Sequence, residues 1–258
     1  MKRILVIAGS DSSAGAGLQA DLKTAQALGV YAQTAVTAIT VQNTSGVRAV
    51  QVLAPELVRG QVEAALQDIG ADAIKIGMLG SGDVAGAVAD ALEQISLPLV
   101  LDPVLLSSSG AALLDAAGVE ILKRRLLPRA TLLTPNLPEV EALIGVDASN
   151  EHGIRNAAQA FALLDCCNVL FKGGHGDGDM VRDVLVEGAS RTVFEAQRQQ
   201  TRHTHGTGCT LATAIACGLA EGLALAEATS RAHAYVQEAI RAAPGLGAGH
   251  GPLQHRFV

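Results

Sequence analysis

The sequence predicts a single α/β domain with a mostly parallel central sheet and helices on both faces. Short runs rich in Val, Ile and Leu alternate along the chain with longer Ala- and Leu-rich stretches. Such alternation is typical of parallel strands joined by right-handed helical crossovers. The 258 residues, 49% of them hydrophobic, are enough to bury one large core. Because no long linker, repeat or low-complexity block divides the chain, we expect one domain over residues 1–258.

The apolar runs place the strands, and the Ala-rich runs place the helices. Strands are expected near 4–8, 73–77, 98–101, 131–133 and 168–171. Helices are expected near 16–28, 56–68, 82–95, 115–126, 152–164, 209–221 and 225–242. Two β-rich regions break the alternation. Residues 30–53, with a turn at 43–46, are expected to form a small β flap over a site at one edge of the sheet, and residues 181–197 a hairpin that turns at 187–190.

Composition argues against several classes of protein. The net charge of -6, the pI of 5.6 and an aromatic content of 2% offer neither the basic surface nor the stacking side chains of a nucleic-acid binder. No apolar run is long enough to span a bilayer, and the apolar start of the chain ends at Gly9, short of a signal-peptide core. The four cysteines show no disulfide framework and no CxxC motif. We therefore expect a cytoplasmic protein without nucleic-acid or membrane partners.

The segment Thr204-His205-Gly206-Thr207-Gly208-Cys209-Thr210 carries the strongest local signal. Its two glycines precede a helix of small apolar residues, so main-chain N–H groups and the positive end of the helix dipole can meet an anion there. A phosphate suits this geometry. The same helix start favours loss of the proton of Cys209, which makes the thiol a candidate base or nucleophile. A Gly-rich helix cap with an inert cysteine is the alternative.

Ligands of open α/β sheets bind beyond the carboxyl ends of the strands. Each expected strand is followed there by a polar or Gly-rich cluster, at 9–21, 77–79, 102–104, 134–139 and 172–175. Two familiar nucleotide motifs are nevertheless a poor match. The pattern Gly15-x-Gly17-x-x-Ala20 begins too far after its strand for a dinucleotide fingerprint and lacks the acidic residue that should answer it. No GxxxxGK[ST] loop is present, so ATP would need another cradle.

Eight motifs follow one another along nearly the whole chain: GSDSSAGAGLQADLKT (9–24), TAITVQNTSGV (37–47), KIGML (75–79), LDPV with a following SG (101–110), TPNLPE (134–139), KGGH (172–175), HGTGCT (205–210) and GLGAGHGPLQH (245–255). In these motifs the chain resembles the hydroxymethylpyrimidine and hydroxymethylpyrimidine-phosphate kinases of thiamine biosynthesis, in the ribokinase superfamily. It implies a ribokinase-like three-layer sandwich, with ATP and Mg²⁺ as cofactors. Departures are minor: Ser13-Ala14 stand where glycines are common, and Cys166-Cys167 precede a strand where a Gly is usual.

The resemblance assigns a group of residues to the substrate. Asp21 and Gln42 match family positions that recognise the aminopyrimidine, and a carboxylate with a carboxamide can bind an amino group and ring nitrogens. Met78 is expected against the flat ring, and Gly9 belongs to the same set. Without the resemblance, Asp21 would be an exposed carboxylate on the first helix, Gln42 a polar strand end and Met78 a core residue.

Another group is expected at the nucleotide end. Lys172 matches a phosphate-contacting lysine of the family, and it needs an anionic partner because it ends a buried strand. Asn136, Glu139 and Thr207 complete the expected nucleotide site. Asp102 and Glu139 are candidate Mg²⁺ ligands, since this ion needs few carboxylates when phosphates supply the rest. Equally, Asn136 can be an N-cap with Glu139 at the third helical position.

The other polar clusters give weaker evidence for a functional site. His203 and His205 with Cys209 suggest zinc only weakly, because a fourth ligand is missing, and a loop-packing or solvated role is favoured. The run of Asp177, Asp179 and Asp183 is read as a solvated turn rather than a calcium loop. His175 is read as a loop residue, with a phosphate cap as the alternative.

The expected chemistry is ATP-dependent phosphorylation of 4-amino-5-hydroxymethyl-2-methylpyrimidine and then of its monophosphate. The catalytic residues expected are Gly206, Thr207, Gly208, Cys209 and Lys172, with the cradle holding the γ-phosphate. A Cys209 thiolate, its pKa lowered toward neutrality by the helix, would accept the proton of the alcohol. The alternatives are a pyridoxal kinase on the same scaffold and a nucleotide-binding regulator without turnover. The expected partners are the small-molecule substrate and, in a homodimer, a second copy of the chain.

Overall fold

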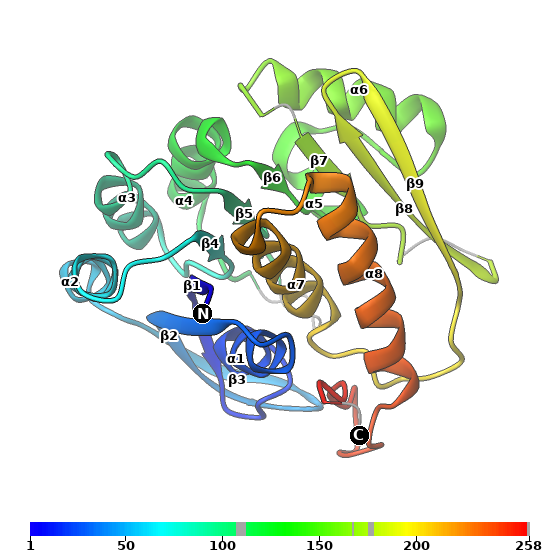
Figure 1. Cartoon of the computed structure of the whole chain (residues 1–258), viewed down its shortest axis with the longest axis horizontal. Helices are drawn as coiled ribbons and strands as arrows, with labels where there is room; N and C mark the ends of the chain where they lie inside the picture. The colour runs from blue at the N-terminus through cyan, green and yellow to red at the C-terminus, as the bar shows by residue number, and fades with distance from the viewer. Residues whose placement is uncertain (107–111, 167, 175–177, 257–258) are drawn as a thin grey trace.

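The computed structural model describes residues 1–106, 112–166, 168–174 and 178–256, and in them one nine-stranded sheet lies between two layers of helices (Figure 1). The strands are β1 (Arg3–Asp11), β2 (Tyr31–Asn43), β3 (Gly46–Val52), β4 (Ala73–Ile76), β5 (Leu99–Leu101), β6 (Leu132–Leu133), β7 (Asn168–Phe171), β8 (Met180–Glu187) and β9 (Ser190–Gln197). The helices are α1 (Gly17–Ala27), α2 (Pro55–Gln67), α3 (Gly82–Ala91), α4 (Ala116–Ile121), α5 (Leu137–Ile144), α6 (Glu151–Ala162), α7 (Thr207–Glu221) and α8 (Leu225–Arg241). A π-helical turn (Leu122–Leu126) and a 3₁₀ turn (Leu127–Arg129) continue α4.

The strand order is β3-β2-β1-β4-β5-β6-β7-β8-β9. The strands from β2 to β7 in this order run parallel, and antiparallel pairs extend the sheet at both ends. All five expected strands and both expected β-rich regions are confirmed. The region expected to form a flap, residues 30–53, is β2 with β3. It is continuous with the central sheet, because β2 pairs with β1 along most of its length.

Alternate side chains of the central strands enter different helical layers, as the pleat requires. Val100, Leu132 and Leu170 pack against α7 and α8. Leu101 and Leu133, from neighbouring positions in the same strands, pack on the other face with α2, α3, α5 and α6. α1 covers β1 on the face of α7 and α8. Burial on both faces explains why these strands read as continuous apolar runs.

Two local features set up the edge where the carboxyl ends of the parallel strands meet. The register of β1 and β2 shifts between Ala8 and Ser10, at Gly9, so β1 bends there. α5 was not expected from the sequence. It begins after Asn136 and ends at Gly145, which has a left-handed backbone (φ +69°) that suits glycine.

The C-terminal segment returns to the turn between β2 and β3. The N–H of His250 donates to the carbonyl oxygen of Thr44 at 2.8 Å, and the N–H of Gly249 donates to the Thr44 hydroxyl at 3.2 Å. Figure 1 shows this end of the chain beneath α8, near the same turn. None of the described helices is both long and apolar enough to cross a membrane.

Candidate active site

The loop after β1 is organised by the carboxylate of Asp11. This buried side chain accepts hydrogen bonds from the main-chain N–H groups of Ser13 (2.8 Å), Gly15 (3.2 Å) and Ala16 (2.8 Å). Burial alone would raise the pKa of Asp11, but hydrogen bonds from His205 and Ser13 outweigh it and lower the pKa to about 2. Asp11 is therefore an ionised anchor that holds the loop in one shape.

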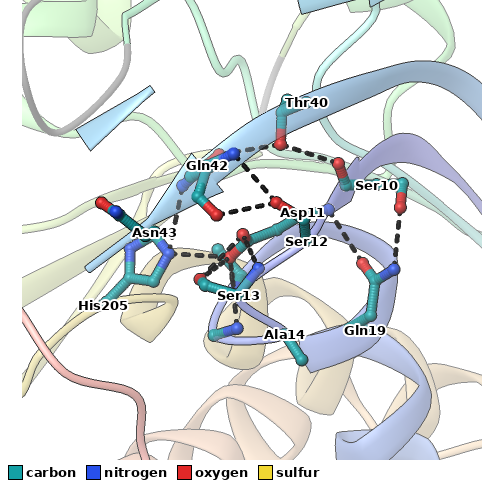
Figure 2. A network of polar contacts seen from close by, with 12 residues as sticks. Ser10, Asp11, Ser12, Ser13, Ala14, Gln19, Thr40, Gln42, Asn43 and His205 are labelled. Atoms are coloured by element: carbon teal, nitrogen blue, oxygen red, sulfur yellow. Dashed lines mark hydrogen bonds and ion pairs between the residues drawn. The ribbon is translucent and has the colours of Figure 1, made fainter. Parts of the chain in front are cut away.

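His205, two residues before α7, connects this helix to the loop; Figure 2 shows its ring beside Asp11 and Gln42. Its Nε2 lies 2.8 Å from Oδ2 of Asp11 and 3.2 Å from Nε2 of Gln42, near the end of β2. A β-carbon on Gly15 would lie 2.4 Å from the imidazole, so the ring packs directly on that glycine. The loop-packing role expected for His205 is confirmed, and among the described residues no group of three or more His, Cys, Asp and Glu side chains is placed to hold a metal.

The start of α7 presents free main-chain donors. Gly206 caps the helix with a left-handed backbone (φ +87°), and a β-carbon there would lie 1.9 Å from the carbonyl oxygen of Gly15. Both the N–H and the hydroxyl of Thr207 donate to the carbonyl oxygen of Thr204. The N–H groups of Gly208 and Cys209 donate to no described residue. Of the predicted cradle, these two positions supply the donors available to an anion.

A buried cation and carboxylate lie next to this helix start. Nζ of Lys172, just after β7, is 2.8 Å from Oδ1 of Asp102, which also accepts the hydroxyl of Thr134 at 3.0 Å. A β-carbon on Gly208 would lie 3.3 Å from Nζ of Lys172 and 3.6 Å from Oδ2 of Asp102. Burial alone would lower the pKa of Lys172, but Asp102 and Glu139 raise it, so the amine is charged. The lysine expected to contact phosphate thus lies beside the free N–H groups of α7.

Glu139 forms the capping box of α5. Its N–H donates to Oδ1 of Asn136 at 2.8 Å, and its carboxylate accepts the N–H of Asn136 at 2.8 Å. The capping alternative is therefore confirmed for both residues. Oε2 of Glu139 also lies 4.0 Å from Nζ of Lys172. Burial raises the pKa of Glu139 to about 7; Lys172 opposes this rise and Asp102 adds to it.

Asp21 forms an ion pair that sequence reasoning did not find. Both it and Lys75, on β4, are 0% exposed. Nζ of Lys75 is 2.8 Å from Oδ2 of Asp21, whose Oδ1 accepts the hydroxyl of Thr213 at 2.7 Å. The interpretation of Asp21 as an exposed carboxylate is wrong, because α1 turns this position toward the sheet. A lysine within the apolar run KIGML was the available signal for a buried partner.

Cys209 lies one helical turn before Thr213, so both side chains are on the α7 face that covers the Asp21–Lys75 pair. Burial raises the pKa of the Cys209 thiol to about 11, and Asp21 and Asp102 add to the rise. Lys75 and a main-chain hydrogen bond from Gly17 act in the opposite direction. The expected lowering by the helix is therefore wrong for the protein without ligands. Desolvation beside two carboxylates outweighs the dipole.

The comparisons with known proteins agree with this geometry. A sequence model of the family described as Phosphomethylpyrimidine kinase matches residues 11–254. The hydroxymethylpyrimidine/phosphomethylpyrimidine kinase of Streptomyces coelicolor is 46% identical over 255 residues, which are 99% of this chain and 94% of that protein. The chain belongs to the phosphomethylpyrimidine kinase family. It spans about half of another relative, the thiamine biosynthesis bifunctional protein ThiED of Geobacter sulfurreducens, with 46% identity over 98% of this chain and 52% of ThiED.

Solved structures agree with the family and confirm the ribokinase-like fold. The phosphomethylpyrimidine kinase of Clostridium difficile 630 is 39% identical, with a TM-score of 0.82, over 93% of this chain and 100% of that one. The pyridoxal kinase of Staphylococcus aureus, in complex with AMP-PCP and pyridoxal, is 34% identical with a TM-score of 0.89, over 99% of this chain and 93% of that one. The same scaffold therefore occurs among kinases named for a pyrimidine and among kinases named for pyridoxal.

In this member of the phosphomethylpyrimidine kinase family, the remaining predicted substrate residues lie side by side on neighbouring strands, Gly9 within β1 and Met78 just after β4. A β-carbon on Gly9 would lie 2.9 Å from the sulfur of Met78, so the two pack directly together. Met78 is buried with Ala38 and Leu113, as the core interpretation predicted. Contact of Gly9 or Met78 with a bound ring stays a prediction.

Other candidates lie away from this site or outside the described residues. Asp183 is buried in β8 and accepts the N–H of Gly173 at 2.8 Å, so its assignment to a solvated turn is wrong. Asp179 is exposed. Cys167, His175, Asp177 and the Ser-Gly pair at 109–110 lie outside the residues that the structure describes.

Proposed function

We propose that this protein uses ATP to phosphorylate hydroxymethylpyrimidine and then its monophosphate, giving the diphosphate used in thiamine biosynthesis. The observation that carries this proposal is the start of α7, where the free N–H groups of Gly208 and Cys209 lie beside the charged amine of Lys172. Phosphoryl transfer needs positioned donors and positive charge more than covalent chemistry. Membership of the phosphomethylpyrimidine kinase family supports the pyrimidine substrate.

In this mechanism the chain's residues have separate roles. The N–H groups at the start of α7 and Lys172 would bind the γ-phosphate and stabilise the charge that develops during transfer. Cys209 is the candidate base for the hydroxymethyl group of the first substrate. Because the thiol is protonated in the free protein, it must first lose its proton to solvent before it can act as the base; Lys75 and the main-chain N–H of Gly17 are the groups that favour the thiolate. The monophosphate already carries charge on its attacking oxygen and needs no base.

The carboxylates of Asp102 and Glu139 fit a role in holding Mg²⁺ on the nucleotide. Both are buried and flank Lys172, and the two side-chain hydrogen bonds that Asp102 accepts from described residues reach Oδ1 rather than Oδ2. Two carboxylates suffice for an ion that keeps several waters and shares the phosphates. When bound, Mg²⁺ would neutralise phosphate charge. Asn136 would hold Glu139 in place through the capping box.

Product analysis tests the proposed function. The protein is incubated with ATP, Mg²⁺ and hydroxymethylpyrimidine, and the monophosphate and diphosphate are followed over time. Parallel reactions with pyridoxal test the second activity found on this scaffold. We expect both pyrimidine phosphates and a lower kcat/KM for pyridoxal. A higher kcat/KM for pyridoxal, or no pyrimidine phosphate at all, would overturn the proposal.

Cys209→Ala separates the base from the cradle. The substitution keeps the main-chain N–H and the helix but removes the proton acceptor. General-base catalysis is worth roughly 10²- to 10⁴-fold, so phosphorylation of the alcohol should fall by about that factor. Phosphorylation of the monophosphate should fall far less. The two rates are measured separately, and equal losses would show that Cys209 supports the shape of the cradle instead of moving a proton.

We also propose that the protein acts in the cytoplasm as a homodimer. On β2, Ile39 is 51% and Val41 56% exposed, and alternate residues of a strand share one face. β3 is the edge strand beside them. A second copy of the chain covering this face would bury both side chains. Light scattering after gel filtration measures the oligomeric state, and the Val41→Asp variant is expected to be monomeric.

A further inference from the structure

The contacts between His205, Asp11 and Gln42 restrict where protons can lie (Figure 2). Nε2 of the imidazole carries either one proton or one lone pair, so it is a donor or an acceptor but not both. The carboxylate of Asp11, with its pKa lowered to about 2, only accepts. Because Nε2 lies 2.8 Å from Oδ2 of Asp11, Nε2 must carry the proton.

This assignment decides which end of the Gln42 amide belongs next to His205. With the amide nitrogen at 3.2 Å from Nε2, two donors would face each other. With the amide oxygen in that position, the imidazole N–H can be shared between Asp11 and Gln42. The amide groups of Asn and Gln are assigned from their hydrogen-bond partners, and these partners favour the oxygen.

Thr40 leads independently to the same orientation. Its single hydroxyl proton has two acceptors within reach, the carbonyl oxygen of Ser10 at 2.9 Å and Oε1 of Gln42 at 3.1 Å. One proton cannot satisfy both. With the amide rotated by half a turn, the NH₂ group of Gln42 donates to Thr40 and Thr40 donates to Ser10. Thr40 and His205 then each have a matched partner, and one of the two N–H groups of the Gln42 amide is left without an acceptor among these residues.

We propose that His205 is a positioning residue: anchored by Asp11, it turns the amide oxygen of Gln42 toward itself and leaves one amide N–H for a hydrogen-bond acceptor of the substrate, such as a ring nitrogen. This inference rests on the proposed function, which supplies the nitrogen heterocycle. His205 immediately precedes Gly206, the N-cap of α7, and its N–H donates to the carbonyl oxygen of Gly251 at 3.1 Å. The group that orients the ring contact is therefore part of the segment that forms the phosphate cradle.

Two substitutions of His205 test the role by steady-state kinetics. His205→Leu removes the donor, and His205→Gln places an amide N–H near the position of Nε2. Loss of one oriented hydrogen bond corresponds to about tenfold, so His205→Leu should raise the KM for hydroxymethylpyrimidine by about that factor. The KM for ATP should stay within about twofold, and His205→Gln should recover most of the loss. An equal rise in both KM values would assign His205 to the cradle alone and overturn the proposal.

A double-mutant cycle with Gln42→Leu asks whether His205 acts through Gln42. If it does, the double variant should have the pyrimidine KM of Gln42→Leu alone. Multiplied effects of the two substitutions would mean independent roles and would contradict the proposal. Thermal unfolding of each variant confirms that it is folded before kinetics are compared.

The proton assignment can be measured in the unmodified protein, even if His205→Leu does not fold. Nitrogen-15 NMR of the imidazoles, assigned with His205→Gln, should show a protonated Nε2 for His205. An unprotonated Nε2 would overturn the inference whatever the kinetics show. Absence of pyrimidine turnover by the unmodified protein would instead contradict the proposed function and leave the measured tautomer to decide the inference.

Discussion

Ala14 has a left-handed backbone conformation, with φ +60°, in the loop that Asp11 organises. A β-carbon is disfavoured there by roughly 1–2 kcal/mol relative to glycine. The side chain of Ala14 is half-buried, and its carbonyl oxygen accepts a hydrogen bond from Nζ of Lys23 at 2.7 Å. The departure from a glycine that was noted in the sequence therefore falls on the position where glycine suits the backbone.

Ala14→Gly should stabilise the protein by about 0.5–1 kcal/mol, because the relief of strain exceeds the added freedom of the unfolded chain. Chemical denaturation measures the change. Ala16→Gly is the matched control, since Ala16 has an extended backbone (φ -134°, ψ -165°) that any residue adopts. That control should lose stability. A gain in both variants, or in neither, would contradict the strain argument.

Glu139 makes stability depend on pH near neutrality. Burial raises its pKa from 4.5 to about 7. A raised pKa in the folded state contributes stability that is complete below about pH 4.5 and is lost as pH rises through about 7. Glu139→Gln should remove this part of the pH dependence while its side-chain oxygen still accepts the N–H of Asn136. Urea unfolding at pH 5, 6 and 7.5 measures it.

The matched control for that experiment is Glu141→Gln, an exposed position on the same helix. If both variants lose the same pH dependence, the effect does not come from the buried carboxyl. If Glu139→Gln keeps the slope of the unmodified protein, Glu139 is ionised well below pH 7 in the folded state.

At the scale of elements, the C-terminal segment holds the turn between β2 and β3. A β-carbon on Gly249 would lie 2.1 Å from the carbonyl oxygen of Thr44, so Gly249→Ala must displace one of the two segments. Loss of a hydrogen bond worth about 1 kcal/mol would raise the opening of the turn roughly fivefold. Hydrogen exchange of amides 43–47 measures this opening.

The same variant should raise the KM for the pyrimidine, because Gln42 lies in the strand that leads into this turn. Ala248→Ser, at the neighbouring exposed position, is the control and should leave exchange unchanged. Faster exchange without a change in the pyrimidine KM would mean that the turn moves independently of Gln42.

Among the elements that the sequence predicted are the central strands, whose residues are buried on two faces. The strands of the sheet centre needed no knowledge of their neighbours, since their apolar runs are local. α5 was missed because it has only eight residues, with Pro138 in its first turn, although Asn136 and Glu139 were recognised as a potential cap.

The site was harder to predict because its contacts join distant segments. Asp11 and His205 are 194 residues apart, and Asp21 and Lys75 are 54 residues apart. The sequence placed Asp11 and Asp21 in the cluster after the first strand and His205 at the start of a helix, but a motif does not show which side chains pair. The prediction of a lowered pKa for Cys209 was wrong for the same reason. The helix start can be read from the sequence, whereas the two carboxylates beside the thiol cannot.

At the scale of the whole molecule, the buried pair of Asp21 and Lys75 connects three elements. Asp21 comes from α1, Lys75 from β4 and Thr213 from α7, so the pair joins the sheet to two helices of one layer. Burial alone would lower the pKa of Lys75, but Asp21, Cys209 and Asp102 raise it, so the amine is charged. Burial raises the pKa of Asp21, and Lys75, 2.8 Å away, together with Thr213 opposes this rise. The ends of these same elements carry the loop at Asp11 and the cradle at Gly206.

Lys75→Met should therefore destabilise the whole domain, by about 3–5 kcal/mol, because it leaves the carboxylate of Asp21 buried without a countercharge. The double variant Lys75→Met with Asp21→Asn is the decisive comparison. It removes both charges, keeps an acceptor for Thr213, and should recover more than half of the loss, since neutral replacement of a buried ion pair costs little. Thermal and chemical unfolding give both values without reference to activity. A double variant as unstable as Lys75→Met would show that the lysine stabilises the domain through its packing between β4 and α7. The unpaired charge of Asp21 would then not be the cause of the loss.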